Sequence, residues 1–305
     1  MLPKTKWKKK TAKPLTGFRK TLDNHNLTMY PISYYNFFRA LTKSIRILPT
    51  FLIIGPSRTG TTALYDYLTK NRFGYRAPHK ELHFFNKYYH KGLLWYRGNF
   101  PTLFHKFYLE NILHKKIIAG EATARYLHDP LVAKRVFDSI PNIKLIVMIR
   151  NPIERAFSHY RRQYEKDNES RTFETVVEKE IAYLSSRNTT FDDDNLDEYS
   201  ERFFIAPYLG RSLYYEQLQI WLKYFKKKQI LLLKSEDFYR EPLNSLDKAY
   251  SFLGTKNYNK HAKLKIKKNA GGYKIPLNSS TEQKLIDFFK PHNQMLYDEW
   301  EIDFS

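Results

Sequence analysis

Nearly continuous apolar runs recur along the chain from residue 50 onward, and each is bounded by polar turns. They cover residues 51–55, 116–119, 143–149 and 230–233. Strands that are covered on both faces carry this unbroken hydrophobicity, whereas half-exposed strands alternate apolar and polar positions. Each run therefore predicts a buried strand.

Segments with the helical spacing of apolar residues lie between these runs, at 61–70, 130–139, 152–166 and 214–225, with a further helical pattern at 285–300. Because helices alternate with strands, the sequence predicts an α/β fold with a single doubly wound domain, in which helices flank a central parallel sheet. We place this domain at residues 47–305 and treat residues 1–46 as a basic N-terminal extension.

The chain has 305 residues, with 52 Lys and Arg against 31 Asp and Glu, so its formal net charge is +21. This charge predicts an anionic partner and leaves nucleic acid, acidic lipid, acidic glycan and a phosphorylated cofactor open. Eight of the cations fall within residues 1–20, where no acid occurs. That segment is typical of a solvated tail, and the alternative is a tether to an anionic membrane or glycan.

Cysteine is absent from the chain. Its absence excludes disulfides, thiol catalysis and cysteine-ligated zinc, and it suits a reducing compartment. No apolar run approaches the ~20 residues of a membrane span, and no apolar segment of a signal peptide follows the basic N-terminus. We therefore expect a cytoplasmic protein that contacts membranes, if at all, only peripherally.

A glycine-rich segment at residues 55–62, GPSRTGTT, joins the first predicted strand to the first predicted helix. A turn in this position directs its backbone N–H groups and the positive end of the helix dipole at an anion. Gly60 allows close approach of the backbone, and the hydroxyl groups of Thr59, Thr61 and Thr62 are further donors. The segment therefore predicts a phosphate-binding loop.

The loop differs from the nucleotide-triphosphate loop G-x-x-x-x-G-K-[ST] at one position. The glycine spacing and Thr62 match, but Thr61 occupies the place of the lysine, and the cation of this loop is Arg58. A kinase needs that lysine at the β- and γ-phosphates, with magnesium on the following hydroxyl. We therefore expect a phosphate ligand other than a magnesium-bound triphosphate.

A second candidate anion site follows the strand at 143–149. Arg150 comes directly after the strand, where open α/β sheets bind their ligands, and its planar guanidinium suits phosphate. Ser158 lies in the second turn of the next predicted helix and can donate to the same group. The alternative for Arg150 is an ion pair with a local carboxylate, and we interpret Arg155, Arg161 and Arg162 as surface charges.

The phosphate loop and the Arg150…Ser158 unit together resemble the sulfotransferases that use 3′-phosphoadenylyl sulfate. Further segments resemble the heparan sulfate (glycosaminoglycan) branch of that family, although Ala122 stands where that branch has a lysine. These segments are KELHFF at 80–85, GLLWY at 92–96, GEATARY at 120–126, RSLY at 211–214 and GGYKIP at 271–276. The resemblance covers the chain from about residue 50 to its end.

The resemblance implies a P-loop-like sulfotransferase fold and assigns the cofactor site. The first loop, with Arg58, would hold the 5′-phosphosulfate, and Arg150 with Ser158 would hold the 3′-phosphate. A late loop would close over the donor phosphates through Gly271, Gly272, Tyr273 and Lys274. The expected donor is 3′-phosphoadenylyl sulfate, the expected product is adenosine 3′,5′-bisphosphate, and no metal is required.

The proposed reaction is in-line transfer of a sulfuryl group to a hydroxyl or amine. Glu81 is the expected general base, both by its chemistry and by the resemblance, and a salt bridge to Lys80 is the alternative. His83 would orient Glu81 or the acceptor, with a satisfied core histidine as the alternative. Lys80, Glu121 and Thr123 are the expected acceptor-binding residues. The acceptor is expected to be a carbohydrate or another hydroxyl-bearing molecule, and an acidic acceptor is one of the alternatives.

Two other functions compete with this one. A P-loop-type nucleotide kinase is disfavoured by Thr61 in place of the lysine. A non-catalytic module that binds nucleic acid or membrane would explain the charge of +21, but generic charge binding does not need the loop together with Arg150. We expect no specific nucleic acid partner.

Overall fold

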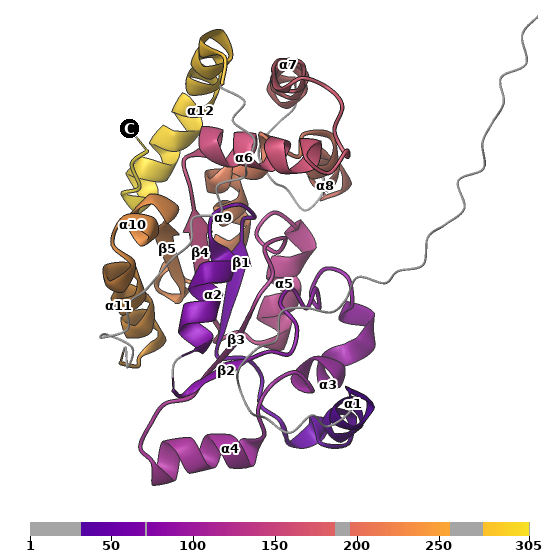
Figure 1. The fold of residues 1–305 in the computed structure, drawn as a ribbon, viewed down its shortest axis with the longest axis vertical. Coiled ribbons are helices and arrows are strands. Elements are labelled where there is room, and N and C mark those ends of the chain that lie inside the picture. The colour runs from indigo at the N-terminus through magenta and orange to yellow at the C-terminus, as the bar shows by residue number, and fades with distance from the viewer. Residues whose placement is uncertain (1–31, 71, 187–195, 257–276, 305) are drawn as a thin grey trace, which may run out of the picture.

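The computed structural model describes residues 32–70, 72–186, 196–256 and 277–304 and contains a parallel sheet at its centre (Figure 1). The five strands have the order β2-β3-β1-β4-β5, and every neighbouring pair is parallel. Their bounds are β1 (Phe51–Gly55), β2 (Gly74–Arg76), β3 (Ile118–Ala122), β4 (Lys144–Ile149) and β5 (Ile230–Lys234). The predicted doubly wound α/β fold is confirmed.

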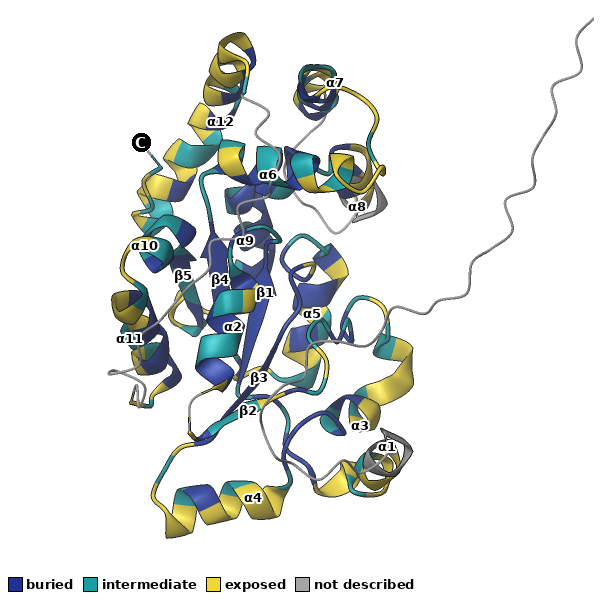
Figure 2. Ribbon diagram, in the orientation of Figure 1, coloured by how far each residue is buried: buried dark blue, intermediate teal, exposed yellow. Residues whose placement is uncertain are grey.

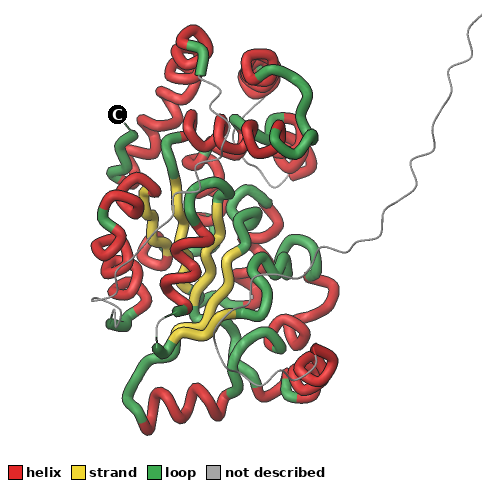
Figure 3. The backbone as a smooth tube through the Cα atoms, viewed as in Figure 1, coloured by secondary structure: helices red, strands yellow, loops and turns green. Residues whose placement is uncertain are grey.

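Both faces of the sheet are covered, as the unbroken apolar runs require. Successive side chains of a strand point to opposite faces. Accordingly Leu52 and Ile54 belong to one buried cluster, with residues of α5 (Pro130–Ser139) and α9 (Tyr214–Leu222). Phe51 and Ile53 belong to the other, with residues of α2 (Thr61–Thr69) and α11 (Pro242–Leu253). Figure 3 shows helices around the strands, and Figure 2 shows the sheet as the most buried part.

A third buried cluster lies above the carboxyl edge of the sheet. It joins α6 (Pro152–Tyr164), α7 (Phe173–Ser185) and α12 (Ser279–Trp300), which meet in Figure 1. The remaining helices are α1 (Ile32–Leu41), α3 (Gly92–Arg97), α4 (Leu103–Phe107), α8 (Leu196–Ile205) and α10 (Ser235–Arg240). None of the helices in the described segments has the length and hydrophobicity that crossing a bilayer requires.

Two expectations about individual segments were wrong. Strand β2 was not expected, because it has three residues and lies half exposed at the edge of the sheet. Arg155 is not a surface charge: its side chain is fully buried. Its guanidinium donates to Ser212 Oγ over 2.6 Å and to the carbonyl of Tyr208. These acceptors lie more than 50 residues further along the chain, so the local sequence does not reveal them.

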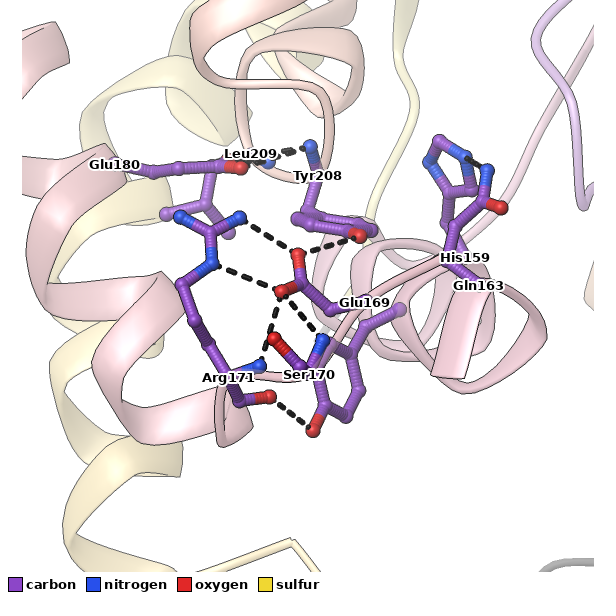
Figure 4. A network of polar contacts seen from close by, with 9 residues as sticks. His159, Gln163, Glu169, Ser170, Arg171, Glu180, Tyr208 and Leu209 are labelled. Atoms are coloured by element: carbon purple, nitrogen blue, oxygen red, sulfur yellow. Dashed lines mark hydrogen bonds and ion pairs between the residues drawn. The ribbon is translucent and has the colours of Figure 1, made fainter. Parts of the chain in front are cut away.

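A polar network holds the end of α6 against the segment after α8 (Figure 4). The Glu169 carboxylate accepts hydrogen bonds from the Arg171 guanidinium at 2.6 and 2.9 Å and from the Tyr208 hydroxyl at 3.1 Å. The Arg171 bonds hold the pKa of Glu169 at about 2. Glu180, on α7, accepts the backbone N–H groups of Tyr208 and Leu209. The Tyr160 hydroxyl, on α6, donates to the carbonyl of Arg171 at 2.8 Å and connects the network to the helix that carries Ser158.

Glu180 makes the stability of this region depend on pH. Burial of its side chain raises its pKa to about 7. Between the ordinary pKa of 4.5 and this value, the folded chain keeps a proton that the unfolded chain has released. Stability therefore falls as pH rises through this window, by up to about 3 kcal/mol for this group. The Glu180→Gln variant should lack this decline when urea unfolding is compared with the wild type at pH 4.5 and 7.

Glu178→Gln provides the control, since Glu178 lies on the same helix but its side chain is 64% exposed. That variant should retain the wild-type decline. An identical pH dependence in Glu180→Gln and the wild type would contradict the raised pKa.

Candidate active site

The phosphate loop lies between the buried strand β1 and helix α2, as the sequence predicted. Gly55 has a φ of +122°, and a Cβ placed on it would lie 2.3 Å from the carbonyl oxygen of Ala124. Gly60, with a φ of +92°, is the N-cap of α2. Only glycine fits Gly55 without displacing the neighbouring backbone. The loop therefore has a shape that places Arg58 and the N-terminus of α2 at the carboxyl edge of the sheet.

The threonines of the loop do not share one role. Thr59 is fully buried, and its hydroxyl donates to the carbonyl of Pro56 over 2.8 Å, so it closes the loop from within. The hydroxyl of Ser235, on α10, donates to the Thr59 carbonyl. Thr61 is buried at the start of α2, whereas Thr62 is exposed. The expectation that the Thr59 hydroxyl donates to the ligand is therefore corrected.

Arg58 and Ser158 are 100 residues apart in the sequence and are hydrogen-bonded in the structure. The Arg58 Nε atom donates to Ser158 Oγ over 3.1 Å. The pKa of Arg58 is lowered, first by burial and then by the positive charges of Arg162 and Arg150. The two anion sites expected from the sequence therefore adjoin each other, and Arg162 adds a third positive charge near Arg58 and Arg150.

Arg150 adopts the arrangement that the sequence left as its alternative. Its guanidinium donates to Glu154 Oε2 at 2.6 and 3.0 Å, and its carbonyl accepts the Tyr214 hydroxyl at 2.9 Å. The Asn151 side chain caps α6 by accepting the N–H groups of Ile153 and Glu154. The ion pair is on the surface and spans one helical turn, so exchanging Glu154 for a phosphate costs little.

Tyr239 lies against the phosphate loop and was not predicted from the sequence. A Cβ on Gly60 would lie 3.0 Å from the Tyr239 hydroxyl oxygen. Burial raises the pKa of Tyr239, while the nearby charges of Arg150 and Arg58 oppose that rise. Tyr239 is thus a neutral donor beside both arginines. It follows the last strand on a short helix, α10, and no motif marks it.

Glu81, His83 and Lys80 form a second cluster on the loop after β2. Glu81 and His83 both have left-handed backbones, with φ of +61° and +53°. The Glu81 carboxylate lies 3.4 Å from His83 Nε2 and 3.4 Å from Lys80 Nζ. The hydrogen bond from His83 lowers the pKa of Glu81, with burial opposing it and Lys80 adding to it. Glu81 is thus ionised at neutral pH and 37% exposed, so its carboxylate is in the form that can accept a proton.

Glu121 and Thr123 lie beneath this loop instead of on the surface of a cleft. Both are fully buried. Glu121 accepts hydrogen bonds from Tyr96 at 2.7 Å, from Tyr126 at 3.0 Å and from Thr123 at 3.0 Å. Burial raises the pKa of Glu121, and these three donors oppose the rise. The expectation that these side chains line the acceptor cleft is therefore corrected: they support the loop from below.

One backbone segment connects the two clusters. The N–H of Glu81 donates to the carbonyl of Ala122 at 3.1 Å, and the N–H of His83 lies 3.5 Å from Thr123 Oγ1. The N–H of Thr123 in turn donates to Ile53, at the end of β1. Residues 122–127 therefore lie between the Glu81 loop and the phosphate loop. Gly271, Gly272, Tyr273 and Lys274 lie outside the described residues.

Comparison with known proteins identifies relatives over most of the chain. A family model described as the sulfotransferase domain matches residues 48–285. The membrane-associated sulfotransferase kil1 of Dictyostelium discoideum is 29% identical over 85% of this chain and 66% of its own length. The mouse heparan sulfate glucosamine 3-O-sulfotransferase 3B1 is 28% identical over 85% of this chain and 65% of its own length. The chain thus spans just under two thirds of each of these curated relatives.

A solved structure has the same fold. The sulfotransferase from Alicyclobacillus acidocaldarius matches 85% of this chain and 98% of its own, with a TM-score of 0.60 and 23% identity. At this sequence identity the match supports the fold alone.

The shape of the phosphate loop can be tested with two glycine substitutions. Gly55→Ala should destabilise the chain strongly, because the new Cβ would meet the Ala124 backbone in addition to the strain of a positive φ. Gly92→Ala is the control, since Gly92 has a φ of +75° but nothing within 4 Å of its Cβ position. We expect Gly55→Ala to lower the free energy of unfolding by at least about 2 kcal/mol more than Gly92→Ala. Equal losses in urea unfolding would contradict the close contact.

Proposed function

Because this chain belongs to the sulfotransferase domain family, we propose that it transfers a sulfuryl group from 3′-phosphoadenylyl sulfate to a carbohydrate hydroxyl or amine and releases adenosine 3′,5′-bisphosphate. The observation that carries the proposal is the hydrogen bond between Arg58 and Ser158. It unites the phosphate loop with the Arg150 unit in one strongly cationic site. A donor with anionic groups at both ends of its ribose needs such a site.

The described residues fit the donor. The loop at 55–60 and the N-terminus of α2 would receive the phosphosulfate, with Arg58 beside them. Arg150 and Ser158 would hold the 3′-phosphate, once Arg150 exchanges Glu154 for it. The late loop with Gly271, Gly272, Tyr273 and Lys274 stays a prediction from the resemblance. When bound, the donor supplies the activated sulfuryl group.

The chain's own groups would stabilise the charge on the leaving group and remove a proton from the acceptor. Arg58, as a fixed cation, would stabilise the negative charge that builds on the leaving phosphate oxygen. Glu81 is ionised and would remove the proton from the acceptor hydroxyl, while His83, at 3.4 Å, holds the carboxylate in place. Lys80 would neutralise Glu81 between turnovers or contact an acidic acceptor. Glu121 and Thr123 would act indirectly, by supporting the loop.

A carbohydrate acceptor is supported by the name of the mouse relative, which acts on glucosamine in heparan sulfate. The net charge of +21 favours an acceptor that carries acidic groups. A nucleotide kinase is not favoured, because Thr61 is buried where a kinase has its phosphate-binding lysine. The cytoplasmic location expected from the sequence remains a prediction.

The role of Glu81 predicts a specific pattern of loss. Glu81→Gln keeps the shape of the side chain but cannot take a proton, so the transfer rate should fall by at least about a hundredfold. The affinity for adenosine 3′,5′-bisphosphate should stay within about threefold, because Glu81 lies on the acceptor side. Glu110→Gln, in the helical turn after α4, should leave both unchanged. Wild-type turnover in Glu81→Gln would remove Glu81 as the base.

The two-ended donor site predicts discrimination between nucleotides. Adenosine 3′,5′-bisphosphate should bind at least about tenfold more tightly than 5′-AMP in calorimetry, because Arg150 and Ser158 gain a charged acceptor. Ser158→Ala should weaken binding of the bisphosphate more than binding of 5′-AMP, because only the bisphosphate has a 3′-phosphate for the hydroxyl to bind. Equal affinity of the wild type for the two nucleotides would refute the assignment of the 3′-phosphate, and magnesium-dependent turnover of ATP would favour the kinase.

A further inference from the structure

Exposed apolar side chains concentrate at one end of the molecule. More than half of the large apolar residues that are exposed in the described chain belong to α1, α3, α4 and the helical turns Lys43–Ile45 and Tyr108–Ile112. In Figure 2 most of α4 is coloured as exposed, and four of the five residues of α1 whose burial is described are exposed. We define the apolar face by the seven apolar side chains of these elements that are more than half exposed: Phe37, Phe38, Leu41, Ile45, Phe104, Phe107 and Ile112.

The elements that carry these side chains are bonded to one another. The Arg39 guanidinium of α1 donates to the carbonyl of Gly98, just after α3, over 2.7 Å. A backbone bridge joins Arg46 to Thr102, and Thr102 caps α4. Helices α1, α3 and α4 also lie at the same end of the molecule in Figure 1. The apolar face therefore belongs to residues 32–48 and 92–113, whose elements are held next to one another.

The charge around the apolar face is almost entirely positive. Residues 32–48 and 86–118 contain nine Lys or Arg and a single acid, Glu110. Lys43, Lys87, Lys91 and Lys116 are exposed among the apolar side chains. The sequence ahead of α1 adds the eight cations of residues 1–20. Aromatic and aliphatic side chains interleaved with lysines suit the interface of an anionic bilayer. The apolar side chains can contact the acyl chains there, while the lysines contact the acidic head groups.

Charge also argues against a second copy of this chain as the occupant. Two apolar faces brought together would place two strongly cationic surfaces, on chains of net charge +21 each, against one another. A bilayer that contains acidic lipid has a negative surface charge, opposite to that of this chain. We propose that the apolar face inserts shallowly into the surface of an anionic membrane.

The topology makes this docking compatible with access to the phosphate loop. The helical turn Tyr108–Ile112 is followed after five residues by Ile118, the first residue of β3. The apolar face thus adjoins the starting edge of the parallel sheet, whereas the loop at 55–60 follows the other end of β1. A chain docked by this face keeps the loop turned away from the bilayer. The proposal does not depend on the identity of the reaction.

Vesicle co-sedimentation of the full chain tests the proposal. The wild type should bind vesicles of phosphatidylcholine with phosphatidylserine far more tightly than vesicles of phosphatidylcholine alone. The double variant Phe104→Ser/Phe107→Ser should weaken binding to the mixed vesicles by at least about tenfold. Phe204→Ser, on α8, is the matched control, because Phe104 and Phe204 are each 78% exposed. It should bind as the wild type does.

Three results would overturn the proposal. The first is wild-type binding to the mixed vesicles by the double variant, which would assign any attraction to the cationic tail alone. The second is an equal loss in Phe204→Ser. The third is a wild-type dimer in analytical ultracentrifugation that the double variant dissociates, which would make a second copy the occupant. Circular dichroism melting of each variant checks that the fold is retained, as expected for substitutions of exposed side chains.

Discussion

The carboxyl edge of the sheet concentrates positive charge around one hydrogen bond, from Arg58 to Ser158, and the rest of the site depends on it. Burial and the fields of Arg162 and Arg150 lower the pKa of Arg58, so the site favours an anion over the ligand-free state. The unusual backbone of the phosphate loop is what brings the Arg58 guanidinium to Ser158. Gly55 passes against the Ala124 carbonyl, and Arg58 has a φ of +75°, so the guanidinium reaches across to α6.

A second layer of constraint lies under Glu81. Two left-handed residues on one short loop, with only Leu82 between them, are costly and persist only where the surroundings hold them. Here the support is Glu121, a buried carboxyl group that receives hydroxyl donors from Tyr96, Tyr126 and Thr123. Glu81 and the buried carboxyl group of Glu121 beneath it have pKa values shifted in opposite directions. At Glu81 the hydrogen bond from His83 outweighs partial burial, whereas at Glu121 full burial outweighs its three hydroxyl donors.

The sequence predicted those features that depend on residues close together along the chain. The apolar runs located four of the strands, and Pro130 and Pro152 marked the starts of α5 and α6. Features that depend on distant partners were missed: the burial of Arg155 rests on Ser212 and Tyr208, and that of Glu121 on the tyrosines that surround it. The link between Arg58 and Ser158 could be suspected only because both were interpreted as phosphate ligands. Tyr239 carries no local signal at all.

A crystal structure of the chain with adenosine 3′,5′-bisphosphate tests the account most directly. The account predicts the 5′-phosphate against the turn at 55–62. It also predicts that Arg150 turns from Glu154 to the 3′-phosphate, with Ser158 on the same group. A nucleotide bound elsewhere, or one bound at this turn while the Arg150 ion pair with Glu154 stays intact, would contradict it.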